Sequence, residues 1–513
     1  MAGSCTSAPL RDRYDVAIVG FGPAGAALAN LLALRGLTVL ALEREADIYR
    51  LPRAVHFDGE CMRVFQTIGI ADQLAPGLVV APGMKFVAAD GELLLDWARP
   101  TQTGPQGWHA SYRFHQPTLE TLLRERLAGQ PSVDIRLRHE VFSVEPGRDA
   151  VSLRLEDMST GRLARTRASY VVGCDGARST VRRFMGTELE DLKSHERWLV
   201  VDVILKHERP DLGDHSIQFC DPARPATYVR GPGARRRWEL MLLPHEDAAQ
   251  MSRPETIWRL LSRWLKPEEA TLERPAAYTF HSVVARGWRN GRMLIAGDAA
   301  HQTPPFMGQG MCAGIRDASN LGWKLADVIA GAAGDELLDT YESERSPHVR
   351  EFIETAVRLG GLIQTTDPQA ARQRDADMRA TRPVFTTPSP RLGPGAYDGA
   401  EPAGRISEQP RLADGLRLDD RVGYRHALLV DSSWHVSADE ARLAVVPADS
   451  AAAREWLARI GAGAVLLRPD RYVAGVANDR DALDRLLRRP SNPYPHPDTQ
   501  RDGARARHES NPS

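Results

Sequence analysis

The N-terminal part of the chain opens with an apolar run, a glycine-rich turn and a second apolar run. YDVAIV leads into GFGPAG (Gly20 to Gly25), which is followed by ALANLLALRG and then by LTVLALER. The lengths and periods of these runs predict a strand, a tight turn, a helix and a second strand. Residues 16–34 carry no charge, but the three glycines and one proline of GFGPAG argue against a membrane-spanning helix or a secretory segment.

Two later apolar strands are predicted to end in turns that contain glycine and aspartate. They are YVVGCDGARSTV (170–181) and RMLIAGDAAHQTPPFMGQG (292–310). The second stretch ends in a Gly-Gln-Gly turn before a predicted helix whose apolar positions repeat with a helical period and form one face. Those positions are Ile315, Ala318, Gly322, Leu325 and Ile329. We therefore expect this helix to pack on one side only, with its N-terminus pointing out of the core.

Alternating apolar and polar residues dominate the middle of the chain. Between Trp198 and Val284, the runs WLVVDVIL, HSIQF, ATYVR, WELMLL and YTFHSVV predict an antiparallel sheet. Residues 365–410 are rich in Pro, Gly, Asp, Arg and Thr and predict a linker or wrapping arm. Short apolar runs and helical patterns at 451–460 and 481–488 then predict a small α/β module, and residues from Pro490 onward are predicted to be disordered.

Length and composition narrow the class of protein. A chain of 513 residues is too long for one core and predicts two or three domains. Its 66 basic and 67 acidic side chains give no basic field for nucleic acid or anionic lipid, so small molecules are the expected ligands. The five cysteines are widely spread without a CxxC pair, which predicts neither disulfides nor a metal site and fits a reducing cytoplasm.

The first glycine turn has the pattern of a dinucleotide site. Gly20 would allow the tight turn, Gly22 the approach of a pyrophosphate, and Gly25 the close packing of helix on strand. Backbone N–H groups at the start of that helix would then face the phosphates. Glu43 ends the next strand, where a carboxylate can accept hydrogen bonds from a ribose. The motif leaves open whether the dinucleotide is FAD or a nicotinamide, and an ordinary tight turn is the alternative.

Together, the three glycine-containing stretches resemble the signature of the flavoprotein aromatic hydroxylases, single-component FAD monooxygenases typified by p-hydroxybenzoate hydroxylase and phenol hydroxylase. The resemblance spans residues 14–350. PRAVHFDGE (52–60) and residues 297–325 are most similar to the 3-(3-hydroxyphenyl)propionate hydroxylases. VLLRPDRYVAGVA resembles part of the redox-inactive thioredoxin-like domain of those relatives, and the module contains no CxxC.

The resemblance implies an α/β fold: a Rossmann-like FAD-binding domain of the glutathione-reductase type, an antiparallel-sheet substrate domain and a small C-terminal thioredoxin-like domain. The expected FAD-binding segments are 1–80, 111–190 and 286–364. The expected substrate-domain segments are 81–110 and 191–285, followed by a linker (365–410), the C-terminal domain (411–490) and a disordered tail (491–513).

The resemblance also implies which residues contact FAD. Asp298 would accept a hydrogen bond from the ribityl chain, and Asp175 would lie between the phosphates and the route of the nicotinamide. N–H groups of the Gly-Gln-Gly turn would stabilise the anionic, reduced flavin. The predicted FAD-binding residues are Gly20, Gly22, Pro23, Ala24, Gly25, Glu43, Arg44, Arg53, Gln116, Arg124, Asp175, Asp298, Pro305, Gly308, Gln309, Gly310 and Met311.

The implied reaction is hydroxylation of a phenol ortho to its hydroxyl, with NADH or NADPH and O2, through a flavin C4a-hydroperoxide. The expected substrate is 3-(3-hydroxyphenyl)propionate or 3-hydroxycinnamate. His56 and Asp58, in the loop after Arg53, are candidates for the base that activates the phenol. This chain departs from the family pattern nearby, because Val55 stands where some relatives place a His or Asp. The candidate substrate-binding residues are Tyr228, Arg230, Trp238, Met241 and His281.

Other functions remain open at this point. A tailoring oxygenase or epoxidase acting on a larger polyketide-like aromatic fits the same motifs, as does a flavin-binding reductase or sensor that transfers no oxygen. A homodimer is an open alternative to a monomer. No membrane, nucleic-acid or metal partner is expected.

Overall fold

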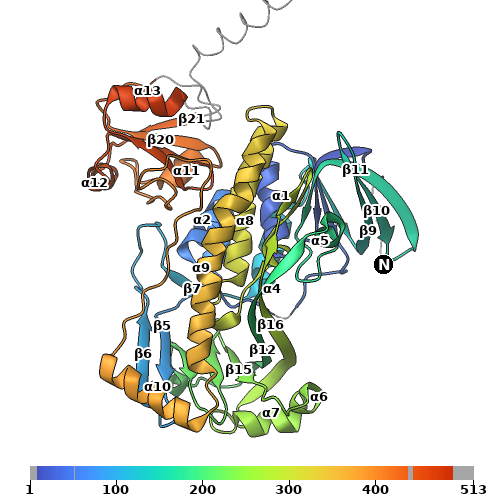
Figure 1. Cartoon of the computed structure of the whole chain (residues 1–513), viewed down its shortest axis with the longest axis vertical. Helices are drawn as coiled ribbons and strands as arrows, with labels where there is room; N and C mark the ends of the chain where they lie inside the picture. The colour runs from blue at the N-terminus through green and yellow to red at the C-terminus, as the bar shows by residue number, and fades with distance from the viewer. Residues whose placement is uncertain (1–8, 51, 437–442, 489–513) are drawn as a thin grey trace, which may run out of the picture.

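The computed structural model describes residues 9–50, 52–436 and 443–488. No helix within these ranges is long and apolar enough to cross a membrane. A C-terminal module lies beside the upper part of a central body built on a largely parallel sheet, and a large second sheet lies at the other end of the long axis (Figure 1). The disorder predicted for residues 491–513 lies outside the described residues.

The first sheet confirms the strand, turn, helix and strand expected at the N-terminus. Strand β1 pairs in parallel with β2, because the connecting helix α1 (Pro23–Leu34) returns the chain across one face, and β1 also pairs in parallel with β11. The strands are, in spatial order, β17 (Arg289–Asn290), β18 (Met293–Ile295), β11 (Arg162–Gly173), β1 (Arg13–Val19), β2 (Val39–Glu43) and β8 (Val133–Leu137). The hairpin of β9 (His139–Pro146) and β10 (Val151–Asp157) extends β11.

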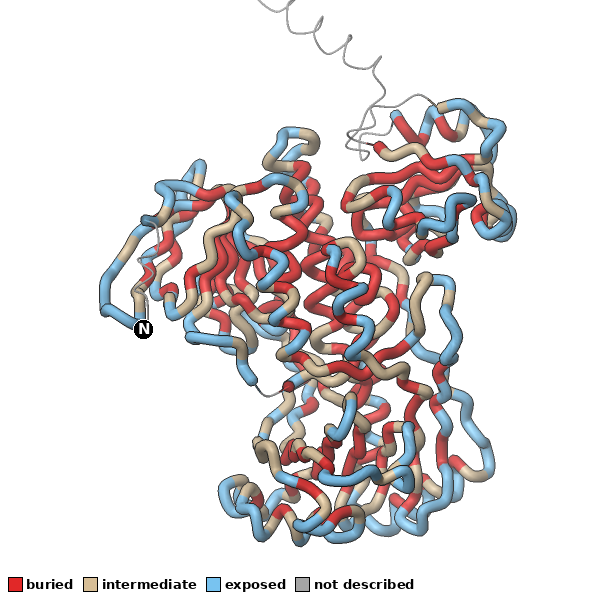
Figure 2. Tube along the Cα trace, turned by 180° about the vertical axis from the view of Figure 1, so that it is seen from behind, coloured by how far each residue is buried: buried red, intermediate tan, exposed pale blue. Residues whose placement is uncertain are grey.

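Helix α8 (Gly310–Ile329) is buried on every side, so the expectation of a single core-facing stripe is wrong. All its residues from Cys312 to Asp327 are buried. The helix packs against α1 and α9 (Thr340–Ile363), and the centre of the molecule is accordingly a block of buried helices (Figure 2). Polar residues of α8 are tolerated there because they pair, as Asp317 does with Arg345 and His301.

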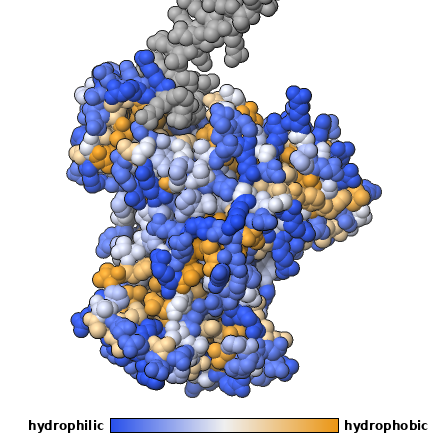
Figure 3. Space-filling view, in the orientation of Figure 1, coloured by the Kyte–Doolittle hydropathy of each residue, from blue (hydrophilic) through white to orange (hydrophobic). Residues whose placement is uncertain are grey.

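The second sheet confirms the antiparallel strands expected between residues 198 and 284. Its spatial order is β19 (His301–Gln302), β16 (Ala270–Arg286), β12 (Glu188–Leu205), β15 (Arg235–Met241), β14 (Ala226–Arg230), β13 (Ser216–Phe219), β5 (Gly83–Val87) and β6 (Leu93–Ala98). Strand β5 joins in parallel with β13. Helices α6 (Ala248–Met251) and α7 (Pro254–Leu261) lie at its far end, and apolar residues gather in the lower half of the face drawn in Figure 3.

A small third sheet connects the two large ones. It contains β3 (His56–Asp58), β7 (Ser111–Arg113) and β4 (Val79–Val80), in the order β3-β7-β4. The remaining helices of this region are α2 (Gly59–Ile68), α3 (Ala71–Leu74), α4 (Gln116–Leu127) and α5 (Thr180–Met185). Strand β3, which follows the loop of Pro52 to Val55, is thereby fixed against β7.

The C-terminal module is a four-stranded mixed sheet with helices. Its strand order is β21 (Leu443–Pro447), β20 (His426–Val430), β22 (Ala464–Leu467) and β23 (Val473–Ala477), with α11 (Leu418–Val422), α12 (Ala451–Arg459) and α13 (Arg480–Arg488). The segment expected to be a linker contains helix α10 (Pro368–Thr381) and then runs along the second sheet, where Phe385 packs on Trp97.

A buried carboxylate joins the module to the central body. Glu344 on α9 accepts hydrogen bonds from Arg468 of the module at 2.8 and 2.9 Å and from Lys324 of α8 at 2.8 Å. It also accepts the backbone N–H of Ala396 at 2.7 Å. Four chain segments therefore meet at one charge that has no access to solvent.

Candidate cofactor and substrate site

The first glycine turn has the geometry of a phosphate cradle. Gly20 has φ +95°, and a Cβ there would lie 2.4 Å from the carbonyl oxygen of Cys174. A Cβ at Gly25 would lie 2.1 Å from the carbonyl oxygen of Gly20. Gly22, the residue before α1, faces open space instead, since no protein atom lies within 4 Å of a Cβ built there. Two glycines thus close the turn, and the third leaves room above the helix N-terminus.

Several predicted FAD-binding side chains converge on this turn. Glu43 accepts the N–H of Phe21 at 2.9 Å, and Arg124 of α4 donates to the carbonyl of Phe21 at 3.2 Å. Gln116 accepts the N–H groups of Arg53 and Ala54 at 2.9 and 2.7 Å, which fixes the loop before β3. The structure therefore brings residues from four separate segments to the same end of the first sheet.

Arg44 and Asp175 are placed differently from the residues of that group. Arg44 is exposed and pairs only with its neighbour Glu45, at 3.3 Å. Asp175 uses one carboxylate oxygen to accept the N–H groups of Thr180 and Val181 at the start of α5. Its other oxygen is buried and has no hydrogen-bond partner in the part of the chain that the structure describes. Burial raises the pKa of this carboxyl. Asp175 therefore caps a helix and still offers one oxygen.

Asp298 lies in the short turn Gly297–Ala299 that follows β18. Its side chain is exposed to solvent, yet the surrounding protein raises the pKa of its carboxyl by desolvation. The Asp298 carboxyl is therefore open to solvent on one side and surrounded by protein on the others. This is the position expected of a carboxylate that contacts the middle of a long cofactor.

The Gly-Gln-Gly turn leads from the second sheet into the buried helix α8. Gly308 has φ +65°, whereas Gly310 begins the helix with an ordinary backbone, so within this turn only Gly308 requires glycine for its backbone conformation. No protein atom lies within 4 Å of a Cβ built on Gly310. The first N–H groups of α8 have no intrahelical partner and carry partial positive charge toward this open space. Met311, the next residue, is half-buried.

His56 and Asp58, the candidate bases, lie beside this turn but are already engaged. Asp58 caps α2 and pairs with Arg316, whose charge helps lower the pKa of the carboxyl to about 2 although burial opposes this. His56 Nδ1 lies 3.2 Å from the carbonyl of Gly308 and must donate to it, so Nε2 is the acceptor. Burial lowers the pKa of His56 well below its usual value, so its imidazole is neutral.

The five candidate substrate residues do not form one site. Tyr228 and Trp238 face the α7 side of the second sheet, in a core with Leu199 and Ile257. Met241 faces the opposite side, toward Trp198 and Phe306. A shift of one residue along a strand reverses the face, and the sequence pattern did not fix which face was the inner one.

The other two candidates, Arg230 and His281, lie away from the core that contains Met241. Arg230 pairs with Asp214 and is half-buried. His281 is exposed and contacts His195, with 2.8 Å between their Nδ1 atoms. These positions give neither residue a contact with the Gly-Gln-Gly turn.

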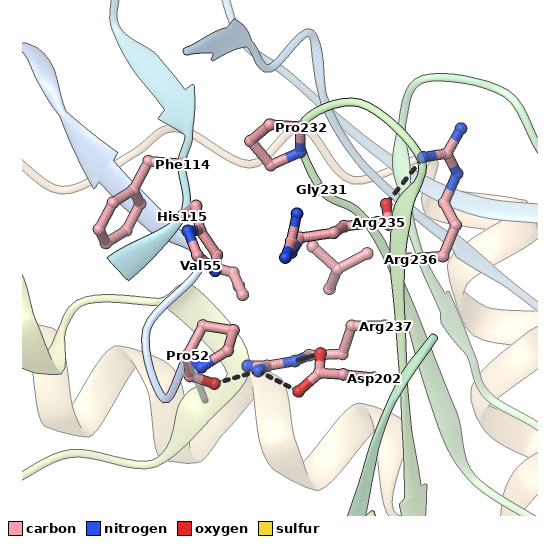
Figure 4. Close-up of a pocket in the computed structure, with 11 residues that line it drawn as sticks. Pro52, Val55, Phe114, His115, Asp202, Gly231, Pro232, Arg235, Arg236 and Arg237 are labelled. Carbon is pink, nitrogen blue, oxygen red and sulfur yellow. Dashed lines mark hydrogen bonds and ion pairs between the residues drawn. The ribbon is translucent and has the colours of Figure 1, made fainter. Parts of the chain in front are cut away.

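Buried residues that the sequence pattern did not single out form this side of the second sheet instead. Phe306 and Met307, directly before Gly308, form an apolar wall with Trp198, and the Trp198 and Phe306 rings meet edge to face at 5.6 Å. Arg237 lines a pocket beside the same sheet and donates to the carbonyl of Pro52 and to Asp202 (Figure 4). It also donates to the carbonyl of Arg53 at 2.9 Å. The turn sequence PPFMGQG contained the signal for the wall, since its apolar residues adjoin the glycines.

These features fit FAD. The open position above Gly22 could take the pyrophosphate, Glu43 would then lie on the adenosine side, and Asp298 would lie toward the ribityl chain. Open space at Gly310 can take the edge of the isoalloxazine ring, next to the partial positive charge of α8. The remaining predicted contacts, Pro23, Ala24, Pro305 and Gln309, belong to the same two turns.

Comparison with known proteins shows the family of the chain. Residues 13–356 match the family model described as FAD binding domain. The chain is 39% identical over 511 residues to a probable NADH-specific resorcinol 4-hydroxylase of Rhodococcus jostii (strain RHA1), covering 93% of this chain and 94% of that protein. It is 38% identical to a 3-(3-hydroxy-phenyl)propionate/3-hydroxycinnamic acid hydroxylase of Mycobacterium sp. (strain KMS), covering 81% and 74%.

Solved structures show the same architecture. The flavin-dependent monooxygenase PieE, crystallised with FAD and substrate, superimposes with a TM-score of 0.82 at 25% identity, covering 95% of this chain and 100% of that one. The OxyS anhydrotetracycline hydroxylase from Streptomyces rimosus gives 0.75 at 26% identity, covering 93% and 98%. With the family match and the full-length relatives, these findings place the chain in the family of single-component FAD-dependent aromatic hydroxylases.

Proposed function

We propose that this FAD-dependent hydroxylase adds a hydroxyl group ortho to the hydroxyl of a small phenol, with NADH as reductant and O2 as oxidant. The proposed substrate is 3-(3-hydroxyphenyl)propionate or 3-hydroxycinnamate, which would become the catechol. The Mycobacterium relative named for these substrates supports this choice. The Rhodococcus relative, named as NADH-specific, supports NADH over NADPH.

One observation carries the proposal: the Gly-Gln-Gly turn is directly next to the apolar wall of Phe306, Met307 and Trp198. Phe306 and Met307 precede Gly308 without a gap, and Trp198 packs against Phe306. A planar aromatic ring held on this wall would lie next to the open position at Gly310. Apolar aromatic surfaces with few polar groups are typical of small-molecule sites. FAD, when bound there, supplies the activation of oxygen.

The chain's own residues bind and orient the reactants. The first glycine turn, Glu43 and Arg124 hold the adenosine side of FAD, while Gln116 holds the loop of Arg53 along it. The N–H groups that open α8 stabilise negative charge on the reduced cofactor. We place the nicotinamide in the same cleft, and the arginine-lined pocket beside Pro52 supports that position.

This function is tested by measuring NADH oxidation with and without the phenol, together with the catechol and H2O2 formed. We expect 3-(3-hydroxyphenyl)propionate to increase NADH consumption, with little H2O2 released and a catechol identified by mass spectrometry. If the phenol increases NADH oxidation but one H2O2 is released per NADH and no catechol forms, the phenol is not hydroxylated. It would then act only as an effector of flavin reduction. The assay without a phenol gives the background rate.

Resorcinol is the second candidate substrate. The Rhodococcus relative named for it matches 93% of this chain and 94% of its own length. A larger polycyclic phenol is a third possibility supported by the anhydrotetracycline hydroxylase structure. Parallel assays with resorcinol and with a tricyclic phenol identify the preferred class by their kcat/KM values and coupling.

Gly310→Val should change the flavin more than it changes FAD binding. The side chain would occupy the open space at the start of α8 and move its N–H groups away from the reduced cofactor. We expect a lower reduction potential and a several-fold higher peroxide yield, because a misplaced dipole no longer favours the anion. A potential titration and the ratio of catechol to NADH measure both. A normal potential with normal coupling would show that α8 does not face the flavin.

The C-terminal module is proposed to be a redox-inactive thioredoxin-like domain that contributes packing. Its strand order β21-β20-β22-β23 supports this, with β20 parallel to β21 and antiparallel to β22. The module has no cysteine among residues 411–490.

We also propose that the enzyme works in the cytoplasm, which its expected use of NADH supports.

A further inference from the structure

Two arginines lie buried beside the Gly308 turn without an acidic partner. Arg99, directly after β6, is 9% exposed, and Arg113 on β7 is 6% exposed. Arg99 donates to His56 Nε2 at 2.6 Å and to Ser111 Oγ at 2.7 Å, while Arg113 donates to Ser216 Oγ. Within the described ranges, neither guanidinium forms a salt bridge with a carboxylate, and Nε of Arg99 is buried without a hydrogen-bond partner.

The acids nearest to these arginines are neutralised by other groups. Asp58, whose charge reaches Arg99, is paired with Arg316 at close range. Glu239, whose charge reaches Arg113, lies 3.9 Å from Arg237, and burial raises the pKa of its carboxyl.

The pKa values of both arginines are lowered, as expected for buried cations without a counter-charge. Burial lowers the pKa of Arg99 to about 10. Burial, and then the charge of Arg99, lower that of Arg113 to about 9. Both groups remain cationic at neutral pH, and two buried like charges without an anion are unfavourable unless an anion binds to them.

The position of the two arginines connects them with the flavin turn. His56 and Arg113 are cross-strand partners of β3 and β7, so both side chains lie on the same face of the small sheet. His56 also contacts Gly308, where a Cβ would lie 3.1 Å from its own Cβ. Ser216 belongs to β13 of the second sheet. The cationic pair therefore lies between the two sheets, one side chain away from the turn that begins α8.

We propose that Arg99 and Arg113 bind a negatively charged oxygen of the aromatic substrate. This rests on the proposed hydroxylation of a phenol. Two groups of 3-(3-hydroxyphenyl)propionate have the required chemistry, the phenolate and the side-chain carboxylate, and both accept charge-assisted hydrogen bonds from arginine. If the anion is the phenolate, the two cations lower the pKa of the bound phenol. They would then provide the activation for which His56 and Asp58 are poorly placed.

Arg113→Met removes one charge and keeps much of the side-chain volume, and Arg113→Lys retains a charge. Affinity is measured from the change in the flavin spectrum of each holoenzyme with three probes: 3-phenylpropionate, resorcinol and 3-(3-hydroxyphenyl)propionate. We expect Arg113→Met to weaken binding of the third probe about 10- to 100-fold, as for a lost hydrogen bond to a charged group, with partial recovery in Arg113→Lys.

The probes distinguish the two sources of the anion. If the carboxylate is bound, 3-phenylpropionate loses affinity in Arg113→Met and resorcinol does not. If the phenolate is bound, resorcinol loses affinity, and the pKa of the bound phenol, read from its ultraviolet absorption, rises. Unchanged affinity for all three probes, or no binding of any probe by the wild-type enzyme, overturns the proposal.

Arg374→Met is the matched control. Arg374 is also 9% exposed, but it pairs with Asp375 on α10 and donates to the carbonyl of Leu362. Its loss should lower stability without a selective change in probe affinity. Because binding is measured without turnover, an enzyme that binds the anion but forms no catechol refutes the proposed hydroxylation and leaves the anion site supported.

Discussion

Gly22→Ala is expected to weaken FAD binding by roughly 10- to 100-fold, as for overpacking by one methyl group worth about 1–3 kcal/mol. The free protein has room for this methyl group, since no protein atom lies within 4 Å of the new Cβ. Gly22 also has φ −74° and ψ −169°, which alanine adopts without strain. The added atom therefore clashes only when a pyrophosphate approaches the start of α1.

Reconstitution of the apoprotein with increasing FAD measures this affinity, and flavin absorbance gives the occupancy. Gly361→Ala is the matched control, because its Cβ also meets no atom and the residue is exposed on α9, a different element from the Gly20 to Gly25 turn. Its FAD affinity should equal that of the wild type. Wild-type affinity in Gly22→Ala would show that the pyrophosphate does not lie above this turn.

Glu344→Ala is expected to lower the free energy of unfolding by about 3–5 kcal/mol, the usual effect of breaking a buried ion pair. The substitution leaves Lys324 buried without its acid and removes two hydrogen bonds from Arg468. It also releases the backbone N–H of Ala396. Urea denaturation of the holoenzyme measures the change. The exposed Glu354 on the same helix is the control, and its change to alanine should have little effect.

The contribution of Glu344 should also depend on pH. Hydrogen bonds and charge from Arg468 and Lys324 lower the pKa of this carboxyl to about 2 in spite of its burial, whereas the unfolded chain has the ordinary value of 4.5. A lowered carboxyl pKa stabilises the folded state above 4.5, and this stabilisation is lost as the pH falls toward 2. The stability difference between wild type and Glu344→Gln should therefore shrink across that range. A constant difference would mean that the charge of Glu344 contributes nothing.

The stretches that could be predicted are those in which the chain determines structure locally. Gly20, Gly22 and Gly25 lie in one turn between a strand and a helix, so their roles follow from spacing alone. Glu43 was predictable because the end of the next parallel strand lies beside that turn. The helix that begins with Gln116 was found from its leucine spacing.

Packing decided what the pattern left open. The apolar positions of α8 indicated one buried face, but the helix lies between α1, α9 and the C-terminal module, so its polar residues are buried as ion pairs. Tyr228 and Met241 were both assigned to the substrate site from strand alternation. They lie on opposite faces of the second sheet, because alternation defines two faces without saying which one a cofactor will cover.

The sequence by itself determined the dinucleotide cradle, the strand and helix order of the FAD-binding domain and its family, because each rests on residues close together in the chain. Only the tertiary structure decided which arginines are buried together without an acidic partner. Arg99, Arg113, His56 and Ser216 come from β-segments far apart in sequence and meet between two sheets. No local pattern predicts such a meeting, since it depends on how long-range strand pairing aligns those segments and on which charges burial leaves without a partner.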